Sequence, residues 1–118
     1  MTKITFYKWD NVFYGFSENG HTGYGESGDD VLCAALSAMT MLIINTIETT
    51  FASDVDYTID EKTTDIRLIA HGALRDYEEN ENKRFAVSGL IEGYYYQLND
   101  MIEDYYDYLD VDVVEELI

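Results

Sequence analysis

The sequence has little cysteine and little positive charge. Its 118 residues include one cysteine, two histidines, and 7 lysines and arginines against 24 aspartates and glutamates. A single cysteine excludes an internal disulfide bond, and one cysteine with two histidines lacks the paired spacing of a zinc site. We therefore expect neither a metal nor another cofactor. The formal net charge of −17 repels nucleic acid and favours basic partners, so we expect no direct contact with nucleic acid.

The chain also shows no segment that would direct it to a membrane. Met1-Thr2-Lys3 leads directly into an alternating strand pattern, without a secretory signal. We expect no apolar run of the chain to span a bilayer. The sequence therefore predicts a cytoplasmic protein with no membrane partner. Its length fits a single domain over residues 1–118, with an acidic tail at about 110–118.

What the chain does contain is an alternation of strand and helix patterns. Period-two spacing of apolar residues predicts two hairpins, with strands at about 3–9, 12–17, 54–59 and 65–70. Helical spacing predicts one helix after each hairpin. The first runs from a cap at Ser27 or Asp29 to about Thr49, and we expect it to be mostly buried. The order predicts an α+β fold: two β-hairpins each followed by a helix, with both helices packed on one face of a small antiparallel or mixed sheet.

The second helix follows a charged stretch at 76–84, and its apolar period continues to Leu109. Gly89 and Gly93 lie within it, where each weakens an isolated helix by about 1 kcal/mol. We expect these glycines to allow close approach to the sheet or to a second chain. We expect the tail at 110–118 to form either a short helix or a docking segment. The helix is also rich in tyrosines, which we assign to the core and to a dimer surface: Tyr94, Tyr95, Tyr96, Tyr105, Tyr106 and Tyr108.

The stretch at 20–38 carries the only cysteine, one of the two histidines and four of the glycines. It begins as a glycine-rich loop and ends as an apolar helix. Cys33 lies in the first two turns of that helix, where positive potential from the backbone favours a thiolate. Asp29 and Asp30 oppose this effect, so a further positive group is needed. His21 is the candidate, because the loop from Gly23 to Gly28 is long enough to fold it back over the helix start, where the two side chains form a nucleophile–base pair.

Helical spacing places two further polar residues on the same face as Cys33. Asp30 lies one turn before Cys33 and is expected to orient the imidazole of His21. Ser37 lies one turn after Cys33 and is expected to hydrogen-bond near the thiolate. Backbone amides at Cys33 and in the glycine-rich loop are candidates for the oxyanion donors.

Each of these residues also has a purely structural interpretation. A lone cysteine on an alanine-rich helix is often a small buried hydrophobe, and a histidine beside glycines often serves only the turn. Asp29 and Asp30 also suit helix capping, and a serine in mid-helix commonly bonds its own backbone. His71, at the end of a predicted strand, is a rival base to His21.

The same stretch resembles the signature of the ribosomal-processing cysteine protease family, Prp. The residues that match in register are Gly20, His21, Gly25, Glu26, Gly28, Asp30, Cys33, Ala34, Ala35 and Ser37. The sequence departs from the family pattern at Thr22, Ser27 and the Val31-Leu32 pair.

This resemblance implies an α/β homodimer that acts as a cysteine endopeptidase. The implied substrate is the N-terminal extension of large-subunit ribosomal protein twenty-seven, which ends in an aromatic-rich stretch before the cut. The implied catalytic residues are His21 and Cys33, with Asp30 assisting. The loop that carries Gly23, Gly25, Glu26 and Gly28 would close over the bound substrate.

Two functions from different classes remain open on the sequence. The first is the ribosomal-protein-processing cysteine protease. The second is a non-catalytic acidic binding module, with a nucleic-acid mimic as one form of it, that captures basic proteins through its net charge of −17 and its tyrosine-rich acidic helix. The two differ in whether function requires Cys33.

Overall fold

The computed structural model describes residues 1–20, 27–60 and 62–118, and for residues 27–30 it describes the backbone alone. In chain order, the regular elements are β1 (Thr2–Trp9), β2 (Val12–Asn19), α1 (Ser27–Asn45), β3 (Asp56–Ile59), β4 (Ile66–Ile69), α2 (Glu81–Tyr105) and β5 (Leu109–Glu115). A π-helical turn, Thr46–Thr50, extends α1, and a 3₁₀ turn, His71–Ala73, follows β4. Both predicted hairpins and both predicted helices are confirmed.

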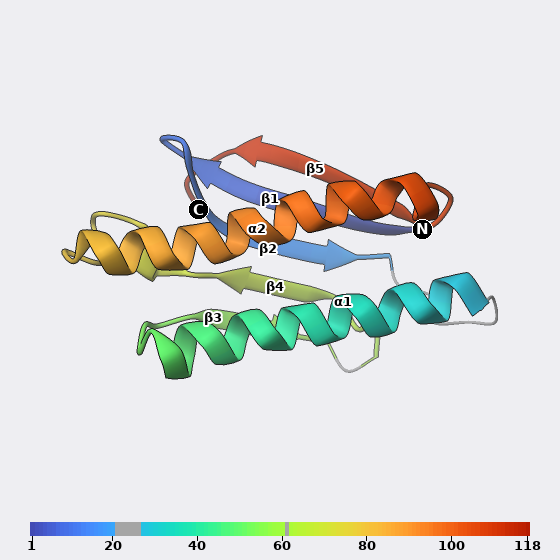
Figure 1. Cartoon of the computed structure of the whole chain (residues 1–118), viewed down its shortest axis with the longest axis horizontal. Coiled ribbons are helices and arrows are strands. Elements are labelled where there is room, and N and C mark those ends of the chain that lie inside the picture. The colour runs from blue at the N-terminus through green and yellow to red at the C-terminus, as the bar shows by residue number, and fades with distance from the viewer. Residues whose placement is uncertain (21–26, 61) are drawn as a thin grey trace.

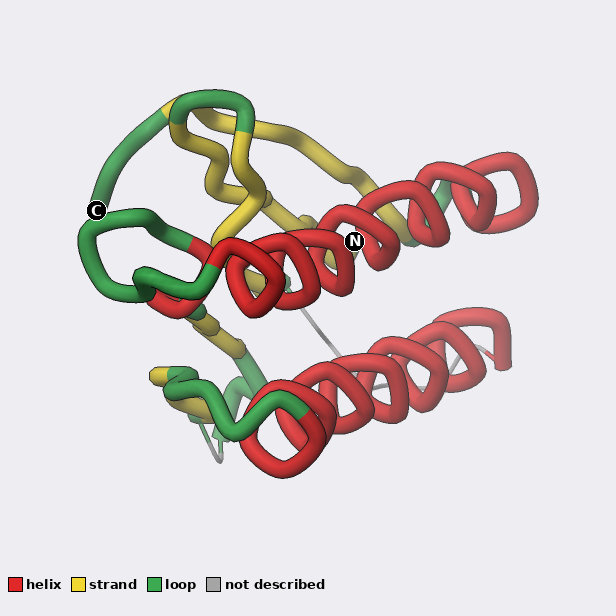
Figure 2. Tube along the Cα trace, turned by 60° about the vertical axis from the view of Figure 1, so that its left-hand side comes forward, coloured by secondary structure: helices red, strands yellow, loops and turns green. Residues whose placement is uncertain are grey.

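The strands form one mixed sheet in the order β3-β4-β2-β1-β5. The two hairpins are antiparallel, and they join through antiparallel pairing of β2 with β4. Figure 1 shows both helices on the same side of this sheet, and Figure 2 shows the same two helices from a second direction. The α+β arrangement predicted from the sequence is therefore confirmed. The end of β2, the start of α1 and the start of β4 lie toward the same side of the molecule in Figure 1.

The C-terminal segment differs from the prediction. Residues 109–115 form β5, which pairs in parallel with β1 from Thr2↔Leu109 to Lys8↔Glu115. The segment beyond β5 is held to β2, because the Tyr14 hydroxyl donates to the Glu116 carbonyl and accepts from the Ile118 amide at 3.0 Å. The prediction of a short helix at 110–118 is wrong. Docking does occur, but as a fifth strand on the open edge of β1.

The turn between β1 and β2 shows why the first hairpin forms where it does. Asp10 and Asn11 both have positive φ, 49° and 64°, and Trp9 pairs with Val12 across them. A two-residue turn with both residues in the left-handed region matches the twist of the flanking strands. Asparagine and aspartate tolerate this region better than other non-glycine residues. The predicted turn at Asp10-Asn11 therefore fixes the register of the central strands.

The core lies between the helices and the sheet. It combines aromatic side chains from the central strands with aliphatic side chains from both helices. The fully buried large members are Ile4, Phe6, Tyr14, Phe16, Leu32, Leu36, Ile44, Ile47, Leu68, Ile91 and Leu98. Phe6 has edge-to-face contacts with Tyr94 and Tyr95 of α2, at centroid distances of 5.8 and 5.3 Å. Each fully buried side chain of this size contributes about 1.5–3 kcal/mol to folding.

Helix α1 is buried on one side only, which corrects the expectation of a mostly buried element. Its opposite side exposes Val31, Met41 and Leu42, with 57%, 41% and 60% of their surface accessible. The stretch Val31–Thr50 is also long and apolar enough to cross a bilayer, by length and composition alone. The expectation that no run would meet that test is wrong. In the structure, however, one face of this stretch packs into the core of the folded domain, as the core helix of a globular protein does.

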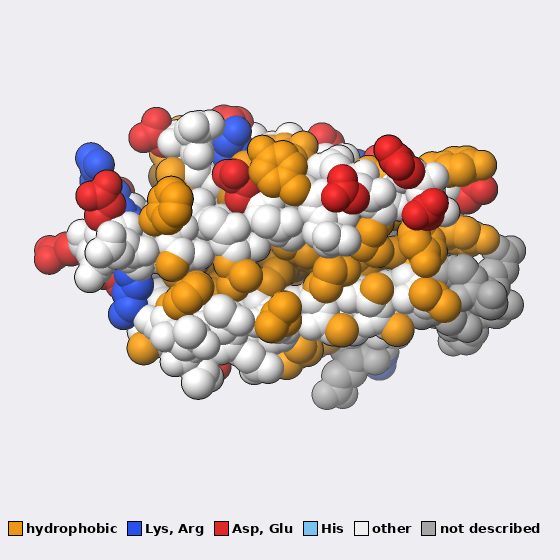
Figure 3. All heavy atoms as spheres, in the orientation of Figure 1, with side chains coloured by type: hydrophobic (Ala, Val, Ile, Leu, Met, Phe, Trp, Pro, Cys, Tyr) orange, Lys and Arg blue, Asp and Glu red, His pale blue; other side chains and the backbone are white. Residues whose placement is uncertain are grey.

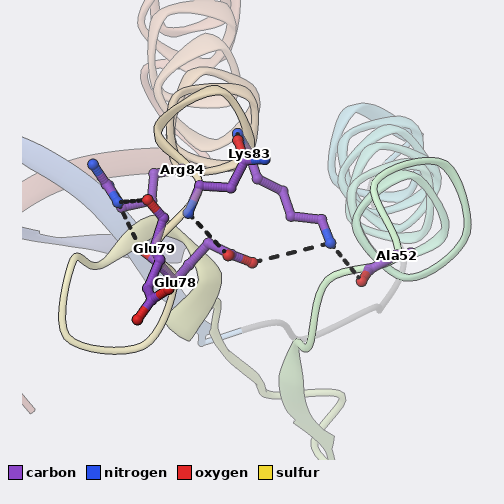
Figure 4. A network of polar contacts seen from close by, with 6 residues as sticks. Ala52, Glu78, Glu79, Lys83 and Arg84 are labelled. Carbon is purple, nitrogen blue, oxygen red and sulfur yellow. Dashed lines mark hydrogen bonds and ion pairs between the residues drawn. The ribbon is translucent and has the colours of Figure 1, made fainter.

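Helix α2 begins at an Asn80 cap and ends at Tyr105, before the predicted end of its apolar period. The Asn80 side chain accepts a hydrogen bond from the Lys83 amide at 3.1 Å. Lys83 also reaches across to the segment after α1, where its Nζ donates to the Ala52 carbonyl at 3.2 Å, and Arg84 donates to the carbonyls of Glu78 and Glu79 (Figure 4). The Lys83 bond ties the start of α2 to the segment that follows α1, and the Arg84 bonds fix the loop that leads into α2.

The two glycines of α2 face away from the sheet. Gly89 and Gly93 are exposed, and a Cβ added to either would meet no described atom within 4 Å outside the helix backbone. The expectation that they allow close approach to the sheet is therefore wrong. Close approach to a second chain stays a prediction.

One polar cluster lies inside the apolar core. Glu18 of β2 is fully buried, and its Oε1 accepts hydrogen bonds from Thr40 Oγ1 of α1 at 3.1 Å and from the Tyr94 hydroxyl of α2 at 2.5 Å. Burial, followed by the nearby Glu18 carboxyl, raises the pKa of Tyr94 well above its usual value of 10.0. Hydrogen bonds to one carboxylate oxygen of β2 therefore connect this strand to both α1 and α2.

This cluster predicts a specific loss of stability at alkaline pH. A tyrosine whose pKa is raised by folding stabilises the protein below its unfolded pKa, and that contribution is lost as the pH rises above about 10. We expect the free energy of unfolding of Tyr94→Phe to fall less steeply above pH 10 than that of the wild type, by up to about 1.4 kcal/mol per pH unit. Urea denaturation between pH 9 and 11 measures this slope. Tyr106→Phe, at an exposed tyrosine, is the matched control and should follow the wild type; equal slopes for all three proteins would contradict the assignment.

Candidate active site

Cys33 opens into a cavity at the end of the molecule where β2 ends and α1 begins. Its side chain is half-buried. The cavity has a volume of about 260 Å³, and α1 supplies one wall through Cys33, Ser37, Thr40 and Met41. The other wall comes from the β3–β4 hairpin, through Ile59, Thr64 and Ile66. The thiol is therefore not sealed in the core, and the interpretation of Cys33 as a buried hydrophobe is not supported.

The helical spacing predicted from the sequence is confirmed where the structure describes it. Cys33 and Ser37 lie on the same side of α1 and share the cavity. Because α1 begins at Ser27, Cys33 falls at the end of its second turn. The effect of the helix dipole fades within the first turn. The helix terminus alone is therefore a weak source of thiolate stabilisation, and a nearby imidazolium remains necessary.

Several predicted site residues lie outside what the structure describes. These are His21, Gly23, Gly25 and Glu26 of the glycine-rich loop, and the side chains of Ser27, Asp29 and Asp30. Gly28 falls in the first turn of α1, where only the backbone is described. The roles of these residues, including the choice of helix cap, therefore stay predictions.

The two ends of that loop are nevertheless placed. Gly20 has φ +85°, and a side chain there would collide with the backbone carbonyl of Met1. Glycine is therefore required at the exit from β2, since the left-handed conformation and the close approach both exclude a Cβ. The residue before His21 is thus fixed against the start of β1.

Hydrogen bonds stabilise the turn of the β3–β4 hairpin, which forms the second wall of the cavity. The Asp60 carboxylate accepts from the amides of Lys62 and Thr63 at 2.8 and 3.0 Å, and these bonds lower the pKa of Asp60. The Asp60 backbone bonds Thr64 and Asp65 across the turn, at 2.8 and 2.9 Å. Thr64 has φ 61°, a conformation that β-branched residues rarely adopt and that concentrates at functional sites.

Sequence reasoning missed this second wall. It assigned no site role to Ile59, Thr64 or Ile66, because the hairpin lies about thirty residues beyond the glycine-rich stretch. The pairing of strands in the structure reveals this wall, since Ile66 of β4 pairs with Glu18 of β2. That register brings the β3–β4 turn beside the strand end that leads to His21.

His71, the rival base, lies away from Cys33. It follows the far end of β4, so extended backbone separates it from Ile66 at the cavity by about 16 Å. Its Nδ1 lies 3.2 Å from Asp56 Oδ2, and its ring packs on Tyr77 with centroids 4.4 Å apart. It lines a separate hollow that shares no residue with the Cys33 cavity. Among the described residues, no group of three or more His, Cys, Asp or Glu side chains is placed to hold a metal ion.

The open cavity predicts that Cys33 reacts with small alkylating agents in the native protein. We expect iodoacetamide to modify it without denaturant, because the thiol is half-buried and lines an open cavity. Ile59→Trp should slow the reaction at least about tenfold by filling the cavity, whereas Tyr57→Trp, two residues away and outside the cavity, should not. Intact-mass measurements over time give the rates. Modification only after unfolding would contradict the observed cavity.

Comparison with known proteins agrees with this arrangement. The sequence model of the family described as cysteine protease Prp matches residues 1–110. A Streptococcus mutans crystal structure is similar to this chain at 22% identity, with a TM-score of 0.80 and coverage of 98% of this chain and 96% of that one.

Two structures of the essential ribosomal processing protease Prp from S. aureus are similar as well. The one with a substrate peptide has 16% identity and a TM-score of 0.78, and the one with a covalently linked product peptide has 17% and 0.75. Each aligns over 97% of this chain and 100% of the S. aureus chain. No curated protein matches the chain by sequence. The motif around Cys33, the shared fold and the match over residues 1–110 together place this chain in the Prp family of cysteine proteases.

Proposed function

We propose that this protein removes the N-terminal extension of large-subunit ribosomal protein twenty-seven, with Cys33 as nucleophile and His21 as general acid and base. The observation that carries the proposal is the cavity of about 260 Å³ on which Cys33 opens. Membership of the Prp family of cysteine proteases supports the reaction class. The solved S. aureus relatives, with a substrate peptide and a covalently linked product peptide, support a peptide as the ligand.

The proposed mechanism follows from the chemistry of a thiolate beside an imidazolium. The Cys33 sulfur adds to the carbonyl carbon of the scissile peptide bond, and its oxygen becomes an oxyanion that backbone amides stabilise. His21, protonated, gives its proton to the leaving amine as the carbon–nitrogen bond breaks. A water then loses a proton to His21 and attacks the thioester, which releases the acid product and restores the Cys33 thiolate beside the His21 imidazolium. Asp30 orients the imidazole in both steps, and Ser37 hydrogen-bonds near the sulfur.

The walls of the cavity suit an apolar side chain beside the cut. Met41, Ile59 and Ile66 surround the thiol with methyl and methylene groups, while Ser37 and Thr40 supply the polar part of the lining. An aromatic residue of the substrate extension would bury its ring there. The loop that carries Gly23, Gly25, Glu26 and Gly28 would then close over the peptide, as the family resemblance implies.

The charge of the protein supports the same substrate. A formal net charge of −17 attracts a basic protein over a distance and raises the rate of encounter at low salt. The alternative, a non-catalytic acidic module that captures basic proteins, rests on this charge and on the tyrosine-rich acidic helix. It is not favoured, because it leaves the Cys33 thiol, its cavity and the family match without a role.

The proposed function predicts cleavage of an extended precursor peptide. We expect the wild type to release the extension and Cys33→Ala to release none, because alanine has no nucleophile. His21→Ala should retain the thiol but lose at least about 10²–10⁴-fold in rate, the usual contribution of general acid–base catalysis. Mass spectrometry of the products gives the cut site and the rate.

His71→Ala is the matched control, since it removes the other histidine, which lies away from the cavity. It should cleave like the wild type. Undiminished cleavage by Cys33→Ala would exclude the proposed nucleophile, and a loss confined to His71→Ala would exclude His21 as the base.

We also propose that the protein is a homodimer joined through the outer face of its helices. Figure 3 shows hydrophobic side chains along α1 and between the two helices, with acidic side chains over α2. Between Val31 and Asn45 α1 carries no charged residue. Two chains of charge −17 repel one another, so a stable contact requires a surface without charge. The outer face of α1 meets that requirement, and its exposed members are Val31, Ala34, Ala38, Met41 and Leu42.

The bare backbone at Gly89 and Gly93 lies on the same outer side of the helical layer, beside the exposed Phe85 and Tyr96. It would allow a second chain to approach α2 closely, as the glycines predict. This contact would also cover Met41, which belongs to the rim of the Cys33 cavity.

The homodimer proposal predicts that one charge at Leu42 separates the two chains. Leu42→Glu places a carboxylate in the centre of the contact, so we expect it to sediment as a monomer at concentrations where the wild type is a dimer. Tyr57→Glu, at an exposed residue of the edge strand β3 and outside both helices, should sediment like the wild type. A wild type that is monomeric at all concentrations, or a Leu42→Glu dimer, would refute the contact.

A further inference from the structure

The buried cluster around Glu18 has no part in the mechanism described so far. Glu18 is 0% exposed, and its Oε1 accepts hydrogen bonds from two hydroxyl groups, Thr40 Oγ1 at 3.1 Å and the Tyr94 hydroxyl at 2.5 Å. Thr40 is itself 1% exposed. A carboxyl group is costly to bury, and a well-packed apolar residue is often as stable at such a position or more so. The cluster therefore calls for an explanation other than stability.

The position of the cluster supplies that explanation. Thr40 lies seven residues after Cys33, which is two helical turns along the same side of α1, and both line the same cavity. Glu18 lies on the strand that leads through Gly20 to His21, and it pairs with Ile66, which lines the opposite wall. The hydrogen bond from Thr40 to Glu18 thus joins the helix that carries the nucleophile to the strand that leads to the base.

Apolar packing alone would fix this relation less firmly. Apolar packing sets which face of α1 is buried, but apolar contacts have no preferred direction, whereas a hydrogen bond between buried groups tolerates little change in distance or angle. A shift of one residue along α1 turns each side chain by 100° and moves it by 1.5 Å. Either change would take Cys33 away from the wall formed by the β3–β4 hairpin.

We propose that Glu18 and Thr40 are positioning residues that hold α1 in the one rotation and axial position at which Cys33 meets His21. The proposal rests on the proposed function, because it assigns the cluster a role in the same reaction. Neither residue touches the substrate carbonyl in this scheme. They act through the backbone of α1 and the end of β2.

The second donor to the same oxygen provides a matched control. Tyr94 belongs to α2, which carries none of the proposed catalytic residues. Thr40→Val and Tyr94→Phe each remove one hydroxyl from Glu18 with little change in shape, so both should lower the melting temperature. Only Thr40→Val frees the helix that carries Cys33. Thr40→Ser retains the hydroxyl and serves as the conservative rescue.

The test is steady-state cleavage of the extended precursor peptide by the wild type and the three variants. We expect kcat of Thr40→Val to fall at least about tenfold with KM little changed, because small misplacement of reacting groups has large effects on rate. Tyr94→Phe should remain within about twofold of wild-type kcat, and Thr40→Ser should recover most of the loss. An equal fall in kcat for Thr40→Val and Tyr94→Phe, or no fall for Thr40→Val, would overturn the proposal.

A substrate-independent measurement separates this proposal from the proposed function. The rate of Cys33 alkylation by iodoacetamide at pH 7 reports the ionisation of the thiol and its access through the cavity, without any substrate. If the wild type reacts quickly but does not cleave the ribosomal precursor, the substrate assignment fails, and the slower alkylation of Thr40→Val still supports the positioning role. If Thr40→Val and the wild type are alkylated at the same rate, the positioning role fails whatever the substrate is. If the wild type neither cleaves nor reacts faster than a free thiol, both proposals fail.

Discussion

The packing of one face of α1 into the core is the interaction on which the site depends. Leu32, Leu36, Ile43, Ile44 and Ile47 are almost completely buried, and each contributes about 1.5–3 kcal/mol to folding. Their spacing fixes which side of the helix is buried and leaves Cys33 and Ser37 at the edge of that buried face, where they open on the cavity. A cysteine in the middle of the buried stripe would be inert, and one on the outer face would lack a second wall. Hydrophobic periodicity therefore places the thiol of Cys33, the proposed nucleophile.

The sheet completes the site because of how its strands pair. The pairing of β2 with β4 brings the turn of the second hairpin to the strand end from which the glycine-rich loop leaves. One wall of the cavity is thus a helix, and the other is a turn stabilised by the Asp60 carboxylate. Catalytic groups in folded proteins commonly sit on loops that a rigid scaffold positions. Here the scaffold consists of two units, each a hairpin followed by a helix, and β5 completes the sheet at the edge of β1.

Local patterns in the sequence predicted the elements that depend on local contacts. The alternation in the hairpins, the turn at Asp10-Asn11 and the face shared by Cys33 and Ser37 all follow from near neighbours in the chain. The parallel pairing of β5 with β1 does not, because it joins the two ends of the sequence. Val111 and Val113 do alternate with acidic residues as a strand requires, but the helical period that reaches Leu109 concealed this signal.

The same limit explains what the sequence could not give for the site. Burial of Glu18 depends on Thr40 and Tyr94, which lie 22 and 76 residues further along the chain. The lining by Ile59, Thr64 and Ile66 likewise required the strand order. The residues of the signature motif, in contrast, were identified from the sequence because they lie within one short stretch.

The central claim is that the Cys33 thiol is ionised at neutral pH through a partnership with His21. The rate of alkylation by iodoacetamide as a function of pH, in the wild type and in His21→Ala, tests this most directly. The account predicts an inflection for the wild type well below 8.5, the ordinary pKa of a thiol, at about 7 or lower, and a return of the inflection toward 8.5 in His21→Ala. Inflections at or above 8.5 in both proteins would contradict it.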